Sequence, residues 1–240
     1  MRYLLLVGSF LLASTLLAAE PEWTVLVGET AGDVWKTPLK GWIYADEVSL
    51  DEKNPRLLSC KPGKAILVNG LKGRERDLVT RQSFGDIELE MDFLIAQRSN
   101  SGVKFHSVYE IQIYDSYGKK ELTGSDCGGI YPRAELLPMY RSIDKGIAPR
   151  TNACKPAGQW QKLHAIFVAP RFDAEGKKIR NARLVKVTLN DIVIHENQEL
   201  QWPTGHNWRR KEVASAPLLL QGDHGPVAFR NVRVRPYASK

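Results

Sequence analysis

The chain has 240 residues, with 34 Lys and Arg against 27 Asp and Glu, and carries a formal net charge of +7. Its length and its 43% apolar content are enough for one globular domain with a sizeable core. The basic excess is spread along the chain without a recognition helix or zinc-finger pattern, so we expect a solvated basic surface and no nucleic-acid partner.

The N-terminus has the pattern of a secretory signal peptide. A basic Arg2 precedes an apolar run that ends at Leu17, and two small alanines follow. We expect residues 1–19 to be the signal peptide and residues 20–240 to form a single exported domain, either periplasmic or extracellular. No later segment is apolar for long enough to span a membrane.

Short segments with alternating apolar residues predict an all-β fold. The clearest is 85–95, where apolar residues alternate with acidic ones, as in a strand with one buried face and one face in solvent. Residues 23–58 are irregular, and we expect extended segments and loops over a sandwich edge there. Other single strands are expected at 65–68, 78–80, 159–168, 184–189, 192–194, 217–221 and 227–234. At least eight strands without an amphipathic helix predict an antiparallel β-sandwich of the jelly-roll type.

Residues 100–115 predict two short strands joined by a tight turn. In the second strand Glu110 and Gln112 point to one face, and the apolar residues between and around them point to the other, because side chains alternate along a strand. A carboxylate and an amide therefore lie side by side on one surface. The same alternation is also typical of a strand that merely faces solvent.

Residues 116–158, which we call the insert, interrupt the strand pattern. Loops longer than about 12 to 15 residues in a compact domain are usually functional or disordered, and the aromatic and proline content favours an ordered loop here. Four residues of the insert offer polar side chains for a site: Tyr131, Arg133, Asn152 and Lys155. The alternatives are a core aromatic for Tyr131 and a surface lysine for Lys155.

Three cysteines follow the signal peptide, and three cannot all pair within one chain. Cys127 and Cys154 lie at two ends of a loop-rich stretch, where a disulfide would stabilise the fold by about 3 to 4 kcal/mol on the loop-entropy model. The sequence is compatible with a disulfide between Cys127 and Cys154 and equally with two free thiols. In the first case Cys60 is a free buried thiol.

The common catalytic signatures are missing from the sequence. There is no Gly-x-Ser-x-Gly elbow, phosphate-binding loop or His-Glu-x-x-His helix. The 5 histidines lie on separate elements without ligand spacing, so we expect no metal site, and only a structural calcium among loop oxygens stays open. Asp223 and His224 lie in a turn bounded by glycines, for which a purely structural turn is the alternative.

Several short motifs along the chain together resemble a known family. They are Asn100-Ser101-Gly102, 109–113, 129–131, Asn152 with 155–160, Leu220-Gln221, His224-Gly225 and 227–232. In order and spacing they are similar to the 3-keto-disaccharide hydrolase domain, also described as a 3-keto-glucoside 1,2-lyase and 3-keto-2-hydroxy-glucal hydratase. The resemblance covers roughly residues 39–237 and implies the concanavalin A-like lectin/glucanase fold. A longer insert around 133–150 marks a subgroup.

The resemblance implies cleavage of a sugar that is oxidised at C3, with a small-molecule or oligosaccharide substrate and no cofactor. A base removes the proton on C2, the enolate expels the glycosidic oxygen from C1, and water then adds, which needs a base, enolate donors and an acid. We expect Glu110 to act as base or acid, Lys155 as an enolate donor and His224 as a proton shuttle. The expected substrate-binding residues are Gln112, Tyr131, Arg133, Asn152 and Asp223.

Two other classes of function stay open. A lectin-like sandwich can bind glycans through its aromatic residues without any chemistry. A conventional glucanase uses two carboxylates about 5 to 10 Å apart. The strand of Glu110 offers Gln112 where a second acid is expected, with only Asp115 beyond it, and this disfavours the glucanase.

Overall fold

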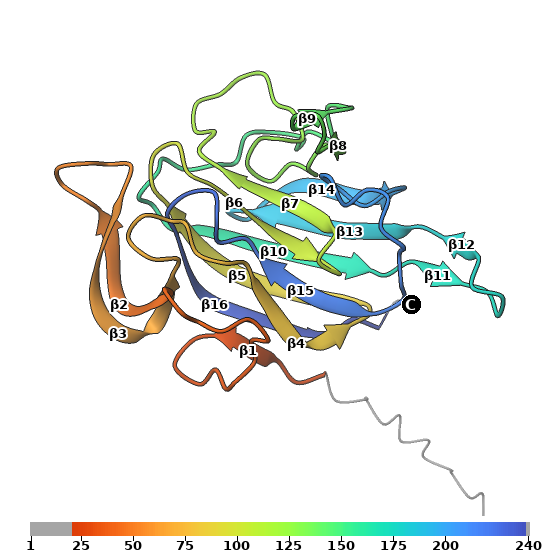
Figure 1. The fold of residues 1–240 in the computed structure, drawn as a ribbon, viewed down its shortest axis with the longest axis horizontal. Helices are drawn as coiled ribbons and strands as arrows, with labels where there is room; N and C mark the ends of the chain where they lie inside the picture. The colour runs from red at the N-terminus through yellow and green to blue at the C-terminus, as the bar shows by residue number, and fades with distance from the viewer. Residues whose placement is uncertain (1–20, 239–240) are drawn as a thin grey trace, which may run out of the picture.

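The computed structural model describes residues 21–238, and the expected signal peptide lies outside them. The described chain forms two main antiparallel sheets and two small hairpins (Figure 1). The long sheet contains, in spatial order, β14 (Ile192–Leu200), β13 (Ala182–Leu189), β10 (Gln161–Val168), β5 (Ile87–Ile95), β16 (Val227–Pro236), β3 (Leu58–Val68) and β2 (Ile43–Leu50), with β1 (Thr24–Val27) also paired to β16.

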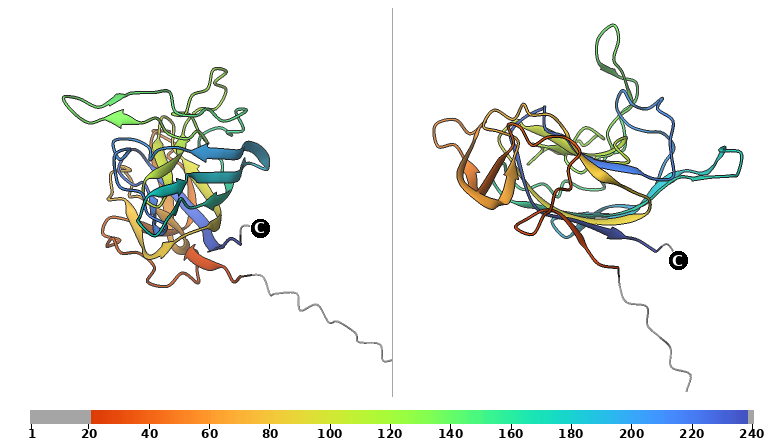
Figure 2. Two further views of the ribbon diagram at one scale, coloured as in Figure 1. Left: turned by 90° about the vertical axis from the view of Figure 1, so that its right-hand side faces the viewer. Right: turned by 60° about the horizontal axis from the view of Figure 1, so that its bottom comes forward.

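The short sheet contains, in spatial order, β4 (Leu78–Phe84), β15 (Ala216–Leu220), β6 (Asn100–Phe105) and β7 (Tyr109–Tyr114). The hairpins are β8 (Ala134–Glu135) with β9 (Arg141–Ser142), and β11 (Arg171–Phe172) with β12 (Lys178–Arg180). Figure 2 shows the β8–β9 hairpin projecting from the sandwich. Within the described residues no helix has the length and apolar character needed to cross a bilayer.

The hydrophobic core lies between the two sheets. Phe105 of β6 stacks on Phe167 of β10 with ring centroids 4.9 Å apart. Tyr109 of β7 lies 5.6 Å from the same Phe167 ring. Apolar side chains from both inner faces fill this layer because the pleat turns every second residue inward. The predicted antiparallel β-sandwich of the jelly-roll type is confirmed.

Residues 23–58 contain extended segments and loops, as expected, but two of these segments are regular strands that the sequence did not single out. β1 and β2 are strands of the long sheet, and β3 begins at Leu58 instead of at residue 65. β2 is the last strand of its sheet, and among its side chains only that of Ala45 is buried. An edge strand of this kind shows no apolar alternation, so its sequence does not indicate a strand.

The acidic face of β5 is more than a solvated surface. It faces arginines on the neighbouring strand β16, in direct cross-strand register. The ion pairs are Glu88 with Arg235 at 2.6 Å, Glu90 with Arg233 at 2.6 Å and Asp92 with Arg230 at 3.1 Å. Glu88, Glu90 and His164 come close enough to hold a metal ion, but the arginines already balance both carboxylates.

The disulfide considered for Cys127 and Cys154 is not formed in this structure. Both residues are buried thiols, and the hydrogen bond between their side chains raises the pKa of Cys127. Hydrogen bonds hold the insert at this point, because Ser116 Oγ accepts from the Cys127 amide at 3.0 Å. Cys60 is a free thiol and is half-buried.

One amide side chain fixes the turn that carries Asp223 and His224. Asn69, which follows β3 and has 0% exposure, donates from Nδ2 to the carbonyls of Gly222 at 2.9 Å and Gly225 at 2.7 Å. Its Oδ1 accepts from the amide of Val227 at 2.8 Å. Buried polar groups need such partners, so Asn69 holds both ends of the turn against the sandwich.

Replacing Asn69 by Ala should leave the Gly225 carbonyl and the Val227 amide N–H without their side-chain partner inside the protein, while the Gly222 carbonyl keeps the amide of Glu75 at 3.0 Å. We expect Asn69→Ala to lower the free energy of unfolding by about 3 kcal/mol, measured by urea denaturation. Asn54→Ala, in an exposed turn, is the control and should cost less than about 1 kcal/mol. Equal effects of the two substitutions would contradict the role given to Asn69.

Candidate active site

The outer face of β7, where Glu110 and Gln112 point, is covered by the insert. Backbone hydrogen bonds of 2.8 Å join Gly128 and Gly129 to Gln112, and the amide of Tyr131 donates to the carbonyl of Glu110 at 3.1 Å. The insert therefore runs along the free edge of β7 and closes over it. Both faces of β7 are buried as a result, so the solvent-facing alternative is wrong.

Glu110 is a buried carboxylate with one cationic partner. Its residue is 4% exposed, and Lys104, directly opposite on β6, places Nζ at 3.3 Å from Oε2. Gly102 gives the carboxylate its space, since a Cβ atom there would lie 2.4 Å from Oε1. Burial raises the pKa of Glu110, and the charge of Lys104 opposes that rise.

A cavity of about 280 Å³ lies at this pair of residues. Ligand cavities in proteins usually measure about 300 to 1,000 Å³, so this one suits a single sugar ring. Four distant parts of the chain supply its walls: β6 and β7, the insert, the loop after β14 and the segment after β15. The lining residues are Asn100, Lys104, Glu110, Tyr131, Tyr140, Gly205, His206, Asn207, Gln221 and His224.

His224 contributes an exposed imidazole to this cavity. Its Nδ1 is hydrogen-bonded to the carboxylate of Asp223. This hydrogen bond raises the pKa of His224 and lowers the pKa of Asp223. His224 is therefore shifted toward the protonated form and is suited to donate a proton near neutral pH.

Two tyrosines of the insert line the same cavity. The hydroxyl of Tyr140, which comes from the β8–β9 hairpin, donates to the hydroxyl of Tyr131 at 3.1 Å. Burial, this hydrogen bond and the charge of Glu110 all raise the pKa of Tyr140. Tyr140 therefore stays neutral and keeps its proton at physiological pH.

Gln221 offers the cavity a free hydrogen-bond acceptor. Its Oε1 is buried and has no hydrogen-bond partner among the described residues. The backbone amide of Gln221 donates to the carbonyl of Gly102 at 2.9 Å, which fixes the residue beside β6. An unpaired buried oxygen in a cavity wall is the group that a ligand hydroxyl would satisfy.

Of the residues predicted from the sequence, this cavity brings together Glu110, Tyr131 and His224, with Asp223 beside the imidazole. Gln112 lies on the same face of β7 but under the insert, where Nε2 donates to the carbonyl of Ser125 at 3.3 Å. It does not line the cavity.

Arg133, Asn152 and Lys155 lie elsewhere. Arg133 lines a neighbouring cavity. Asn152 donates to the carbonyl of Ser116 at 2.7 Å, within the insert. Lys155 is exposed, and its Nζ donates to the carbonyl of Trp160 at 3.3 Å. The cation that accompanies Glu110 is Lys104, so the structure does not bring Lys155 to the predicted site.

No site role was predicted for Lys104, Tyr140 or Gln221, although Leu220-Gln221 is one of the family motifs. Lys104 could have been predicted, because the hairpin expected over 100–115 pairs it with Glu110. Tyr140 and Gln221 arrive from loops whose contacts are long-range, and no local pattern indicates that they line a cavity with Glu110.

The comparisons with known proteins agree with this fold. A model of the 3-keto-alpha-glucoside-1,2-lyase-like domain matches residues 22–235. The chain belongs to this family. A search of the curated proteins gave no match. The resemblance seen in the sequence is thus confirmed.

Solved structures show the same fold. A "putative glycosyl hydrolase" from Parabacteroides distasonis has a TM-score of 0.60 at 21% identity, over 94% of this chain and 95% of that chain. A second such protein from the same organism has a TM-score of 0.56 at 17% identity, over 90% of this chain and 100% of that chain. At these identities the 3-keto-alpha-glucoside-1,2-lyase-like domain shares a fold with them, and its site must be argued from its own residues.

Removing the charge of Lys104 should raise the pKa of Glu110 further. We expect the Glu110 carboxyl of Lys104→Met to titrate at a higher pH than that of the wild-type protein, because a nearby opposite charge favours the ionised form. The measurement is a ¹³C NMR titration of the glutamate carboxyls, with Glu110→Gln used to assign the signal. Lys155→Met is the control and should leave the titration unchanged. A pKa that stays the same in Lys104→Met would contradict the pairing.

Proposed function

We propose that this domain cleaves 3-keto-glycosides by elimination followed by hydration, with Glu110 as the general base. The observation that carries the proposal is a buried carboxylate with a raised pKa, held beside one cation at the wall of a ring-sized cavity. The family to which the chain belongs supports the choice of substrate.

The chemistry balances without an oxidant or reductant. The C3 ketone acidifies the C2 proton, which the Glu110 carboxylate removes, and the electron pair forms an enolate. The enolate expels the glycosidic oxygen from C1, and this oxygen takes up a proton as it leaves. Water then adds across the new C1–C2 double bond, with the hydroxyl on C1 and a proton on C2, so that the sum is hydrolysis.

The raised pKa of Glu110 suits a base that must take the C2 proton near neutral pH and release it to solvent before C2 is protonated again during hydration. A carboxylate at its ordinary pKa is a weaker base.

In this proposal Lys104, and not Lys155 as expected from the sequence, is the cationic donor to the enolate oxygen. Its ammonium lies at 3.3 Å from Glu110 and lines the cavity, where it stabilises the developing enolate oxygen. Tyr131, whose hydroxyl accepts the hydrogen bond from Tyr140, keeps its own O–H free to donate to the same oxygen. Preorganised donors of this kind act where charge appears in the transition state and need no reorganisation.

His224 protonates the leaving oxygen in this proposal. Its position in the cavity and its raised pKa, caused by Asp223, suit a general acid. The free oxygen of Gln221 accepts a hydrogen bond from a sugar hydroxyl and orients the ring.

No step of this mechanism uses a metal or cofactor. The expectation that the protein needs no cofactor, with a structural calcium as the one option left open, stays a prediction.

The same cavity disfavours a conventional glucanase. Glu110 is the one carboxylate among the residues that line it, and a glucanase would need two.

Export is also part of the proposal, through cleavage of the signal peptide at residues 1–19. A mature N-terminus at Glu20, read by mass spectrometry of the exported protein, would support it.

Replacing the base should remove the activity while the fold stays intact. We expect Glu110→Gln to lower kcat/KM on a 3-keto-glucoside at least about 100-fold, the usual contribution of a positioned general base, measured as release of the aglycone. Lys155→Gln is the matched control and should stay within twofold of wild type.

Activity of Glu110→Gln within threefold of wild type would remove Glu110 from the mechanism. Turnover of an unoxidised glucoside by the wild-type protein would favour a glucanase instead. Binding of both sugars without turnover would favour a lectin-like module.

A further inference from the structure

We propose that a second cavity beside the Glu110 site is the subsite for the leaving group, where the indole of Trp202 stacks on a neutral sugar ring. This inference rests on the proposed function. It implies that the substrate is a disaccharide or a longer oligosaccharide, cleaved between a ring in each cavity.

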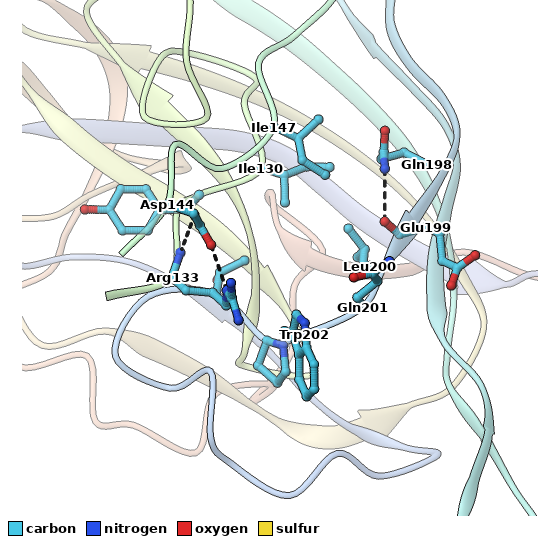
Figure 3. A pocket seen from close by; sticks show the side chains of 12 residues that line it. Ile130, Arg133, Asp144, Ile147, Gln198, Glu199, Leu200, Gln201 and Trp202 are labelled. Atoms are coloured by element: carbon cyan, nitrogen blue, oxygen red, sulfur yellow. Dashed lines mark hydrogen bonds and ion pairs between the residues drawn. The ribbon is translucent and has the colours of Figure 1, made fainter. Parts of the chain in front are cut away.

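The second cavity has a volume of about 400 Å³. Figure 3 shows Arg133 and Asp144 of the insert on one side, Gln198 and Glu199 on the other, and Trp202 below them. Trp202 is 51% exposed, which is unusual for the largest apolar side chain and leaves much of the indole open. A second sugar ring fits a space of this size.

The two cavities share a wall. Tyr131 lines both of them. Thr204 lines the second cavity, and its Oγ1 accepts from the backbone amide of Glu110 at 3.1 Å. Gly205, the next residue, lines the first cavity, and its amide donates to the carbonyl of Pro132 at 2.9 Å. A substrate that passes Tyr131 would therefore place its glycosidic bond near the boundary of the two cavities.

Arg133 is held in place for a ligand by an ion pair and two aromatic rings. Its Nε donates to Asp144 at 2.7 Å, and its guanidinium carbon lies 5.3 Å from the ring of Trp208 and 5.9 Å from that of Trp202. Within residues 21–238, Asp144 is the one hydrogen-bond acceptor of the Arg133 side chain. Its terminal nitrogens are thus available to sugar hydroxyls.

The charge balance identifies the ligand as neutral. Asp144 compensates Arg133 within the cavity, and Glu199 on the opposite wall is paired with Arg183 at 3.9 Å. An acidic sugar or a phosphate would meet no excess of positive charge here. An open indole with fixed polar groups around it is suited to the apolar face and the hydroxyls of a neutral hexose.

The test uses two substrates that differ only in the leaving group. One is a 3-keto-disaccharide with glucose as the leaving group, and the other is methyl 3-keto-glucoside. We expect Trp202→Ala to lower the ratio of kcat/KM for the disaccharide to kcat/KM for the methyl glycoside at least tenfold, mainly through KM. Trp202→Phe, which keeps an aromatic face, should restore most of the ratio.

Trp23→Ala is the matched control, because Trp23 also lies beside arginine side chains, at 4.5 and 4.6 Å, but does not line either cavity. It should leave the ratio unchanged. An unchanged ratio in Trp202→Ala would overturn the subsite.

Calorimetry with the unoxidised disaccharide separates this inference from the proposed function, because it needs no turnover. Binding that Trp202→Ala weakens at least tenfold supports the subsite, even if the 3-keto-disaccharide is not cleaved and the proposed function fails. Binding that Trp202→Ala leaves unchanged, or no binding to the wild-type protein, overturns the subsite.

Discussion

The pairing of Glu110 with Lys104 is the interaction on which the site depends. A carboxylate with 4% exposure loses most of its contact with water, and it can ionise there only beside an opposite charge. The β6–β7 register places that charge directly across the hairpin, and Gly102 leaves room for the carboxylate. Burial and Lys104 act on the pKa of Glu110 in opposite directions, and their balance gives the site its capacity for proton transfer.

The sandwich itself supplies only one wall of the cavity, and the other walls are loops fastened to it by specific hydrogen bonds. Asn69 fixes the turn of His224. Thr204 ties the loop after β14 to the backbone of Glu110. The insert holds to the edge of β7 through Tyr131. Rigid strands therefore carry the base and its cation, while loops carry the groups that surround the sugar.

The sequence predicts strands well where one face is buried. The alternation over 85–95 and around Glu110 identified β5 and β7 and the face on which Glu110 lies. The alternation did not reveal β2, because an edge strand with a single buried side chain shows no two-residue period of apolar residues. Residue type alone could not decide between two lysines. Lys155 belongs to a family motif, but it bonds to Trp160 and does not line the cavity, whereas strand pairing brings Lys104 to Glu110. Tyr140 and Gln221 depend on loop packing, which local sequence does not encode.

The central claim is that Glu110 removes the proton on C2 of a 3-keto-glycoside. The most direct measurement is NMR of deuterium incorporation at C2 during turnover in deuterated water, with a reaction without enzyme as the baseline. The account predicts that wild-type product carries deuterium at C2 above this baseline and that Glu110→Gln catalyses no exchange. Cleavage by the wild-type protein with the original proton retained at C2 would contradict the account.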